Sequence, residues 1–291
     1  MANYRAVVRH FPPALEYLRQ AKWIRRGDVL AYWPGVSTAA FSTDEFGFRH
    51  TRFEDRDIGF GDLGRYDRVG LVLGSSHVFG FGLAHNRETL PSRLSEILGY
   101  PFFGISFPEA DTRTLFASFS RLAEAYGSKL ARVVLITGGD FTRYCYSEQA
   151  DPLFGSPFLP QAAAVTPGGD ADQHFANLVQ FTRFWSSRFA AAAGEAFCML
   201  DDVTYFEKPR ADGVETACGL GIPSDDRQRR RFAAHLRRAL MFQAERRRMA
   251  TELGFLLAAF PSPRELFFID EFHYRAETQD LIAHGLADQI H

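Results

Sequence analysis

The composition describes a folded protein of one large or two small domains, with 291 residues, of which 46% are hydrophobic and 23% charged. The net charge of −2 argues against a general nucleic-acid binder. No window approaches the ~20 apolar residues that span a bilayer, and the first residues show no apolar core of a signal peptide. We therefore expect a cytoplasmic protein with neither a membrane nor a nucleic-acid partner.

The three cysteines are scattered and form no CxxC pair, so the sequence predicts neither a disulfide framework nor a zinc site, and no metal or cofactor is expected. Residues 1–67 are predicted to form an N-terminal extension that packs on a main domain of residues 68–291. Within the extension, Pro12-Pro13 can open a helix that runs to Trp23. Residues 59–64 match GxGxxG but precede a strand instead of following one, so they predict a loop and no nucleotide site.

Strands and helices alternate along the main domain. The apolar runs predict strands at 69–73, 101–106, 132–136, 197–200 and 266–269. Helices are predicted up to Gly99 and at 112–126, 172–193, 225–253 and 278–290, and loops at 147–170 and 207–224. The alternation predicts a three-layer α/β/α fold of flavodoxin-like type, with a mostly parallel sheet of about five strands.

Chemistry-bearing residues follow the first and the last of these strands. Ser75 and Ser76 lie in a tight turn after the first strand, and Asp270 and His273 follow the last one at an i, i+3 spacing. A serine hydroxyl becomes a good nucleophile when a neighbouring base takes its proton, and the base is oriented by a carboxylate. In an irregular turn, this spacing can bring the carboxylate to Nδ1 and leave Nε2 for the serine.

Two blocks resemble those of the SGNH (GDSL-type) esterases and acyltransferases. GSSHVFG (74–80) is similar to their GDSxxxG block and DEFH (270–273) to their DxxH block, and the resemblance covers roughly residues 68–291. It implies Ser76 as the nucleophile, His273 as the base and Asp270 as its orienting carboxylate, with Ser75 as the rival nucleophile. The GFR segment Phe46–Arg49 is also similar to one in SGNH-like proteins associated with polysaccharide modification, although packing of two Phe side chains explains it as well.

The oxyanion hole is where the resemblance departs from the family pattern. After the second strand, Gly104 is the only glycine, and Phe107 stands at the usual glycine position. After the third strand, Gly139-Asp140 stands where the family has Asn-Asp, or Asp140 itself replaces the Asn. These four positions are the predicted oxyanion and substrate-binding residues.

Loss of one oxyanion donor costs about 3 kcal/mol of transition-state stabilisation. Thr137, Thr142 or Arg143 can supply the missing oxyanion donor. Otherwise the enzyme is slow or no longer performs acyl chemistry. The predicted function is therefore an esterase or acyl hydrolase that acts on an ester or thioester of a small molecule or carbohydrate. The alternatives are an O-acyltransferase on a sugar or natural product and a catalytically degenerate binding domain. The Arg-rich helix 225–253 is either a solvated face or a docking surface for an acyl carrier protein or acyl-CoA.

Overall fold

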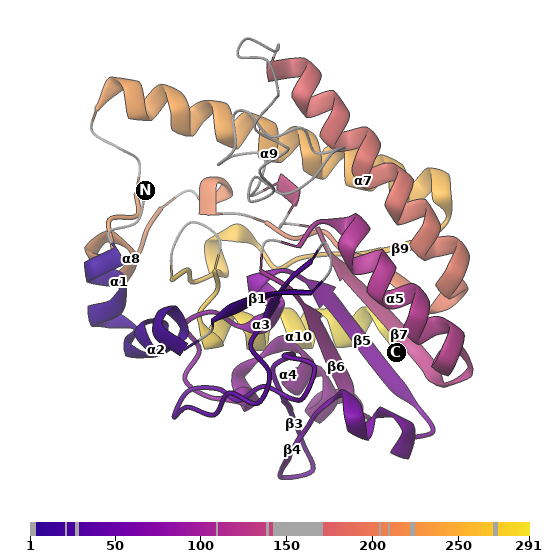
Figure 1. Cartoon of the computed structure of the whole chain (residues 1–291). Helices are drawn as coiled ribbons and strands as arrows, with labels where there is room; N and C mark the ends of the chain where they lie inside the picture. Colours follow the sequence, from indigo (N-terminus) through magenta and orange to yellow (C-terminus); the bar gives the residue numbers. More distant parts are fainter. Residues whose placement is uncertain are drawn as a thin grey trace.

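A parallel sheet of five strands forms the centre of the computed structural model, with strand order β6-β5-β7-β8-β9 (Figure 1). The strands are β5 (Val69–Gly74), β6 (Phe102–Ser106), β7 (Leu130–Ile136), β8 (Phe197–Leu200) and β9 (Leu256–Ala258). Numbered within the sheet this order is 2-1-3-4-5, the flavodoxin-like order. The predicted fold class is thereby confirmed. The structure describes residues 4–20, 22–26, 29–108, 110–137, 140–141, 171–203, 205–208, 210–221, 225–269 and 273–291.

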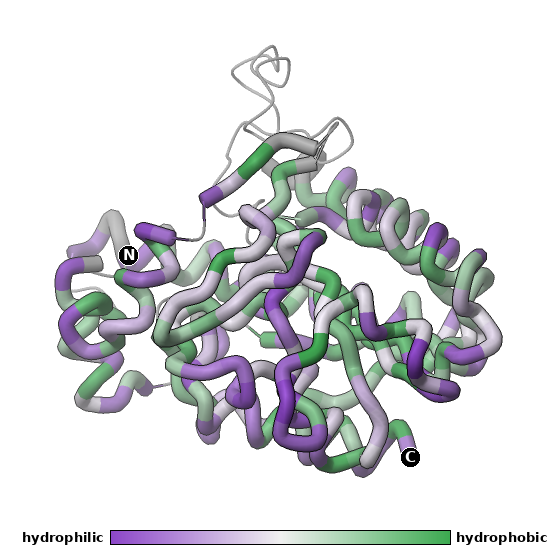
Figure 2. Tube along the Cα trace, turned by 60° about the horizontal axis from the view of Figure 1, so that its bottom comes forward, coloured by the Kyte–Doolittle hydropathy of each residue, from purple (hydrophilic) through white to green (hydrophobic). Residues whose placement is uncertain are grey.

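Helices cover both faces of the sheet, which gives the three predicted layers. On one face α4 (Leu90–Leu98) and α10 (Ala276–Ile290) pack in one hydrophobic core, and on the other α5 (Thr112–Tyr126) and α7 (Ala171–Ala193) pack in a second. Every residue of β5, β6 and β8 is buried, as expected when both faces of a parallel sheet are covered. In Figure 2 the helices at the right of the view alternate green and purple along the tube, because each buries only one side.

The last strand of the sheet is not the predicted one. Residues 266–269 form only an isolated bridge between Phe268 and Tyr274, whereas Leu256–Ala258, directly after α9 (Asp226–Leu253), pairs with β8. The apolar run at 266–269 is buried by packing against neighbouring elements, so its composition reports burial and not strand pairing. The true edge strand has three residues and is partly exposed, so it leaves little pattern in the sequence.

The N-terminal residues pack against the region that follows β5. An aromatic cluster joins Tyr17, Tyr32 and Phe41 to Phe79 and Phe81. Of these residues, Tyr17 lies in α2 (Pro12–Gln20) and Tyr32 in β2 (Val29–Tyr32). The other elements of the N-terminal region are α1 (Tyr4–His10), β1 (Trp23–Arg26), β3 (Thr51–Phe53), β4 (Arg56–Ile58) and the 3-10 helix η1 (Phe60–Arg65).

Several predicted boundaries change in the structure. The first long helix ends at Gln20, and Trp23 begins β1, while the predicted loop at 59–64 is mostly the 3-10 helix η1. The predicted loop 207–224 contains α8 (Gly213–Ala217), and the predicted loop 147–170 lies outside the described residues. The remaining short elements are α3 (Ser76–Phe79), η2 (Asn86–Glu88), η3 (Gly127–Lys129), η5 (Gly194–Ala196), η6 (Tyr205–Glu207) and η7 (Pro263–Glu265). Among the described residues, no helix has the length and apolar character to cross a bilayer.

Candidate active site

The turn after β5 places Ser76 at the start of the one-turn helix α3. Gly74 allows this tight turn, because a Cβ at that position would lie 2.6 Å from Val78 Cγ2. Gly80 ends α3 in the left-handed region with φ of 81°, a conformation that glycine adopts at no steric cost. The short helix therefore packs directly on the carboxyl end of the sheet and carries Ser76 there.

Ser76 meets His273 although 197 positions separate them, with 2.7 Å between Ser76 Oγ and His273 Nε2. Both residues are partly exposed. The His273 ring lies 4.4 Å from the Phe81 ring and 5.4 Å from the His77 ring, measured between centroids. The structure thus brings together the two residues that the motif blocks single out. Asp270, the third predicted member, lies outside the described residues.

Ser75, the rival nucleophile, forms a second serine–histidine pair beside the first. Its Oγ lies 2.9 Å from His77 Nδ1, and both residues are buried. Ser75 is only 4% exposed, in contrast to the partly exposed Ser76. Ser76 is therefore the more exposed of the two serines.

A buried ion pair fixes the segment that leads to His273. Lys208 Nζ donates to both carboxylate oxygens of Glu215 at 2.8 Å and also to Leu266 O. The Glu215 carboxylate in turn accepts the Phe268 N–H at 2.8 Å. The Lys208 and Glu215 side chains thus supply hydrogen bonds to residues 266–268, which the sequence had predicted to pair in the sheet. Beyond them, the Ile269 N–H donates to His273 O at 2.7 Å.

Arg275 anchors the other side of the His273 segment. Its guanidinium contacts the Asp212 carboxylate at 2.9 Å and donates to Phe268 O at 3.2 Å. Burial opposes ionisation of Asp212, but hydrogen bonds from the Glu215 N–H and from Arg275 outweigh it and lower the Asp212 pKa. Asp212 stays ionised at neutral pH and keeps this contact.

The predicted oxyanion residues after β6 have packing roles in the structure. Gly104 lies inside β6, where an added Cβ would lie 3.1 Å from Pro91 Cγ and 3.2 Å from Val78 Cγ1, so glycine allows α3 and α4 to approach the sheet. Phe107 follows the carboxyl end of β6, and its ring is buried 5.3 Å from the Phe48 ring.

Asp140, predicted at the same hole, contacts two threonines. Its carboxylate accepts the Thr112 N–H at 3.0 Å and hydrogen bonds from the hydroxyls of Thr112 and Thr182. These contacts tie the end of β7 to α5 and α7. Gly139 lies outside the described residues, as do the suggested substitute donors Thr142 and Arg143.

The structure adds an acidic pair that the sequence reading missed. Asp201 and Asp202 directly follow β8 and are buried, and Arg246 of α9 lies 3.1 Å from Asp201 Oδ1 and 3.4 Å from Asp202 Oδ1. The sequence signal that could have identified this pair is its place directly after a predicted strand, at the carboxyl end of a parallel sheet. Burial, with Asp202 and Glu207 nearby, raises the pKa of the Tyr274 hydroxyl well above its usual value.

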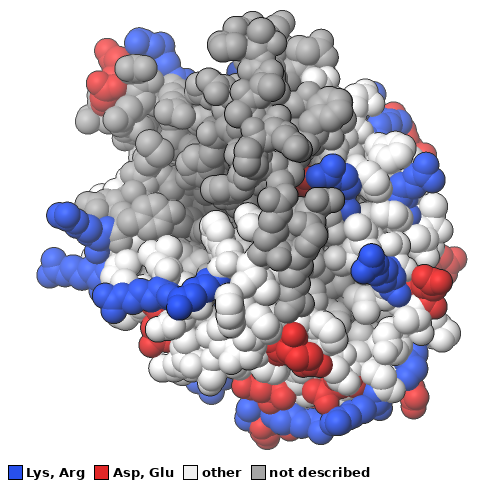
Figure 3. All heavy atoms as spheres, in the orientation of Figure 1, with Lys and Arg blue, Asp and Glu red and all other residues white. Residues whose placement is uncertain are grey.

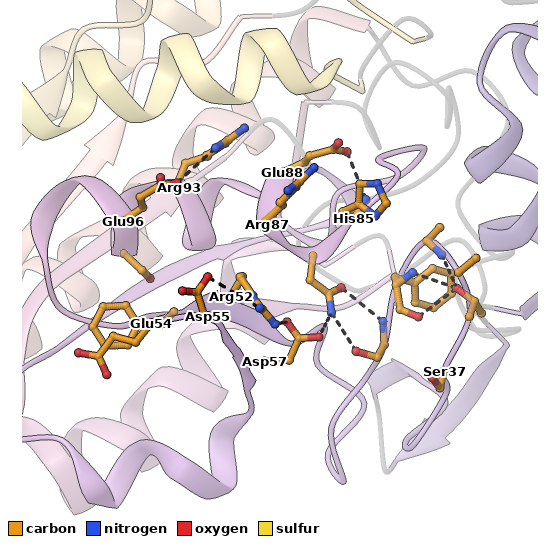
Figure 4. A pocket seen from close by; sticks show the side chains of 18 of the residues that line it. Ser37, Arg52, Glu54, Asp55, Asp57, His85, Arg87, Glu88, Arg93 and Glu96 are labelled. Carbon is orange, nitrogen blue, oxygen red and sulfur yellow. Dashed lines mark hydrogen bonds and ion pairs between the residues drawn. The ribbon is translucent and has the colours of Figure 1, made fainter.

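A polar hollow of about 1040 Å³ lies elsewhere on the surface and includes neither Ser76 nor His273 among its lining residues. Most of its labelled side chains come from the β3–β4 hairpin, from η2 and from α4, and many are charged (Figure 4). Figure 3 shows blue and red atoms intermixed around this hairpin at the bottom of the view.

Comparisons with known proteins give structural likeness alone. No family model matches the chain, and no curated protein matches it. Similar solved structures include LAE5, an α/β hydrolase from the metagenome of Lake Arreo (13% identity, 77% of this chain and 94% of that one, TM-score 0.44). Others are a lipase/acylhydrolase from Enterococcus faecalis (13%, 77% and 95%, 0.41) and Est24, a carbohydrate acetylesterase from Sinorhizobium meliloti (13%, 77% and 98%, 0.42). The chain resembles SGNH-type hydrolases in its motif blocks, and its function is inferred below from its own residues.

Proposed function

We propose that the protein is a serine-dependent SGNH-type esterase or acyl hydrolase, acting on an ester or thioester of a small molecule or carbohydrate. The observation that carries the proposal is the 2.7 Å contact between Ser76 Oγ and His273 Nε2 at the carboxyl edge of the sheet. Clefts for ligands lie at this edge in open α/β sheets. The contact has the geometry of an activated nucleophile and its base.

The reaction runs in two steps. His273 Nε2 takes the Ser76 proton while Oγ attacks the carbonyl carbon, and the same proton then passes to the leaving alcohol or thiol. Water next attacks the acyl-serine, gives its proton to His273, and releases the acid as Ser76 regains its hydrogen. Asp270 is proposed to hold the proton-bearing Nδ1 of His273 in place, as the motif resemblance implies.

Two donors are candidates for the oxyanion hole. The Ser76 N–H has no hydrogen-bond acceptor in the described part of the chain. The Thr137 hydroxyl follows β7, is buried, and has no partner in the same part of the chain. Leu73 of β5 pairs with Leu135 of β7. Ser75 and Thr137 each lie two residues further along, so both directly follow the ends of these neighbouring strands. A preorganised donor at this position would stabilise the oxyanion.

A fluorophosphonate probe and a p-nitrophenyl ester series test the proposal. Wild-type protein should be labelled at Ser76 and should hydrolyse the short esters, and Ser76→Ala and His273→Ala should each abolish both. Ser75→Ala is the matched control and should keep most of the labelling. Absence of labelling at Ser76 in folded wild-type protein would refute the proposal and favour the degenerate binding domain.

The O-acyltransferase alternative uses the same serine and histidine and differs in the group that attacks the acyl-serine. Product analysis with a sugar or other alcohol acceptor present separates the two: an acylated acceptor in place of free acid supports transfer. The departures from the family pattern at Ser75, which stands where the family has Asp, and at Phe107 and Gly139 are the sequence features that favour the degenerate binding domain as a further alternative.

Docking of an acyl carrier protein or acyl-CoA on the Arg-rich residues 225–253 is proposed as the alternative to a helix face that is only solvated. Salt bridges engage the end of this helix, since Arg247 contacts Asp201 at 3.0 Å and Arg248 contacts Glu245 at 2.6 Å. Arg230 and Arg237 remain exposed nearer its start. Charge reversal at these two should raise the KM for acyl-CoA if the donor docks there, and leave it unchanged if this face is only solvated.

A further inference from the structure

Arg49, at the end of the segment Phe46–Arg49, is a buried arginine from the N-terminal region that reaches the helix carrying Ser76. It is only 6% exposed. Its Nη1 donates to Phe79 O at 3.1 Å and to Gly80 O at 2.8 Å, at the carboxyl end of α3. Its Nη2 donates to Ala40 O at 2.8 Å, and its Nε donates to Asn86 Oδ1 at 2.9 Å.

Three backbone carbonyls and one amide oxygen accept hydrogen bonds from this cation, the rings of Phe41 and Phe79 lie 5.7 Å and 5.8 Å from it, and in the described residues no carboxylate forms an ion pair with it. Burial lowers the Arg49 pKa to about 9, while Glu88 and Asp57 favour its charged form, so the guanidinium is cationic at neutral pH. Burying a charge without an ion-pair partner costs free energy, which its hydrogen bonds must offset. An apolar side chain would fill the same space but leave the carbonyls unpaired.

Two of the carbonyls that accept from Arg49, at the end of α3, lie in the chain between Ser76 and Phe81, and both of these residues contact His273. α3 is a single turn, and the carbonyls at its end lack intrahelical partners, which a cation at a helix C-terminus satisfies. Ser76 begins the turn and contacts His273 Nε2, and Phe81, directly after Gly80, packs on the His273 ring. Any shift of the Phe79–Gly80 backbone therefore moves both contacts of His273.

We propose that Arg49 is a positioning residue, which fixes α3 so that Ser76 Oγ faces His273 Nε2. The N-terminal region thereby becomes part of the active-site framework. The inference rests on the proposed function for its kinetic readout, while its structural readout is independent of acyl chemistry. Gly80 fits this role, because a Cβ there would lie 3.1 Å from Arg49 Nη1.

A second layer holds Arg49 itself. Asn86, whose carbonyl accepts from Arg49, donates through Nδ2 to Asp57 Oδ2 at 3.0 Å and to Ser42 Oγ at 2.9 Å. Asp57 is labelled in Figure 4, with this hydrogen bond drawn. Ala40 and Asn86, two of the hydrogen-bond partners of Arg49, both line the polar hollow. We therefore expect methylguanidinium from solution to enter the space that removal of the Arg49 side chain leaves beside this hollow.

The test compares Arg49→Ala and Arg49→Lys with Arg56→Ala, an exposed arginine of the same region whose guanidinium donates to Tyr66 OH. The first readout is the second-order rate of fluorophosphonate labelling at Ser76, measured against pH on protein shown to be folded by circular dichroism. The second is amide hydrogen exchange of a peptide covering 76–83, which needs no acyl chemistry. Both measurements are repeated in roughly 10–50 mM methylguanidinium, so that a weakly bound cation occupies its site. Urea at the same concentration is the control.

We expect Arg49→Ala to lower the plateau labelling rate about 100-fold with an unchanged pH midpoint, and Arg49→Lys to lower it about 10-fold. Exchange in 76–83 should rise in both, and methylguanidinium should restore Arg49→Ala at least fivefold, while Arg56→Ala stays within twofold of wild type. Labelling and exchange of folded Arg49→Ala within twofold of wild type would overturn the inference, as would a failure of methylguanidinium to restore either. If wild type is not labelled at all, the proposed function fails, and exchange alone decides the role of Arg49.

Discussion

Lys208→Met removes the cationic half of the buried pair that holds the approach to His273. The side chains of Lys208 and Glu215 are 4% and 0% exposed, so little solvent reaches the carboxylate when its partner is lost. Methionine has a similar length and apolar stem, so the change removes charge and hydrogen bonds more than volume. Leu266 O also loses its donor from Lys208.

The expected loss follows from this burial. Breaking a buried ion pair by removing one partner costs about 3–5 kcal/mol, because the remaining charge is left uncompensated. Glu215 retains the N–H groups of Phe268 and Asp212 as donors, at 2.8 Å each, which favours the lower end of that range. With an unfolding entropy of about 2.1 cal/mol/K per residue, a 291-residue chain has roughly 0.6 kcal/mol/K, so Tm should fall by about 5–8 °C.

Thermal and urea unfolding measure the loss, with Lys129→Met as the control. Lys129 is a partly exposed lysine that donates to Gly64 O, and its removal should change Tm by less than about 1 °C. The double variant Lys208→Met with Glu215→Gln removes the stranded charge and keeps one carbonyl acceptor. It should recover about half of the lost stability. A single-variant loss below about 1 kcal/mol, or a double variant no more stable than the single, would refute this reasoning.

Three further predictions concern other buried groups. Thr137→Val should lower kcat about 10²-fold with little change in KM if the hydroxyl donates to the oxyanion, and an unchanged kcat would remove it from the hole. Arg246→Met removes a buried cation shared by two buried carboxylates, although Asp201 keeps its contact with Arg247, and should lower the free energy of unfolding by about 3 kcal/mol, whereas exposed Arg229→Met should lower it by less than about 0.5 kcal/mol in the same urea titration. Burial raises the Cys198 pKa to about 12 from 9.0, so native protein at pH 9 should leave Cys198 unalkylated by iodoacetamide in peptide mass spectra. The Cys198 thiol has a higher pKa in the folded state than in the unfolded state. Its contribution to the free energy of unfolding is therefore complete below about pH 9 and is lost as the pH rises towards 12.

The fold class follows from the sequence because buried parallel strands and amphipathic helices have distinct periods. The runs at 69–73 and 197–200 became β5 and β8, and the long helices at 172–193 and 225–253 were found within one residue at each end. The run at 266–269 was misread because an apolar run signals burial whether or not it pairs. The short strand 256–258 was missed for the opposite reason, since it pairs at an edge while partly exposed.

The motif blocks were enough to select Ser76 and His273, because a turn after a strand and a following helix fix where such residues lie in a parallel sheet. The sequence could not show that the two atoms come within hydrogen-bond distance. Nor could it show that Arg49 reaches the end of α3, or that Lys208 and Glu215 form a pair that holds the segment before His273. Those contacts join positions far apart or across irregular loops, where no repeating period links one residue to its partner. Only the packing of the folded chain, which excludes water and leaves each buried polar group to find a partner, decides them.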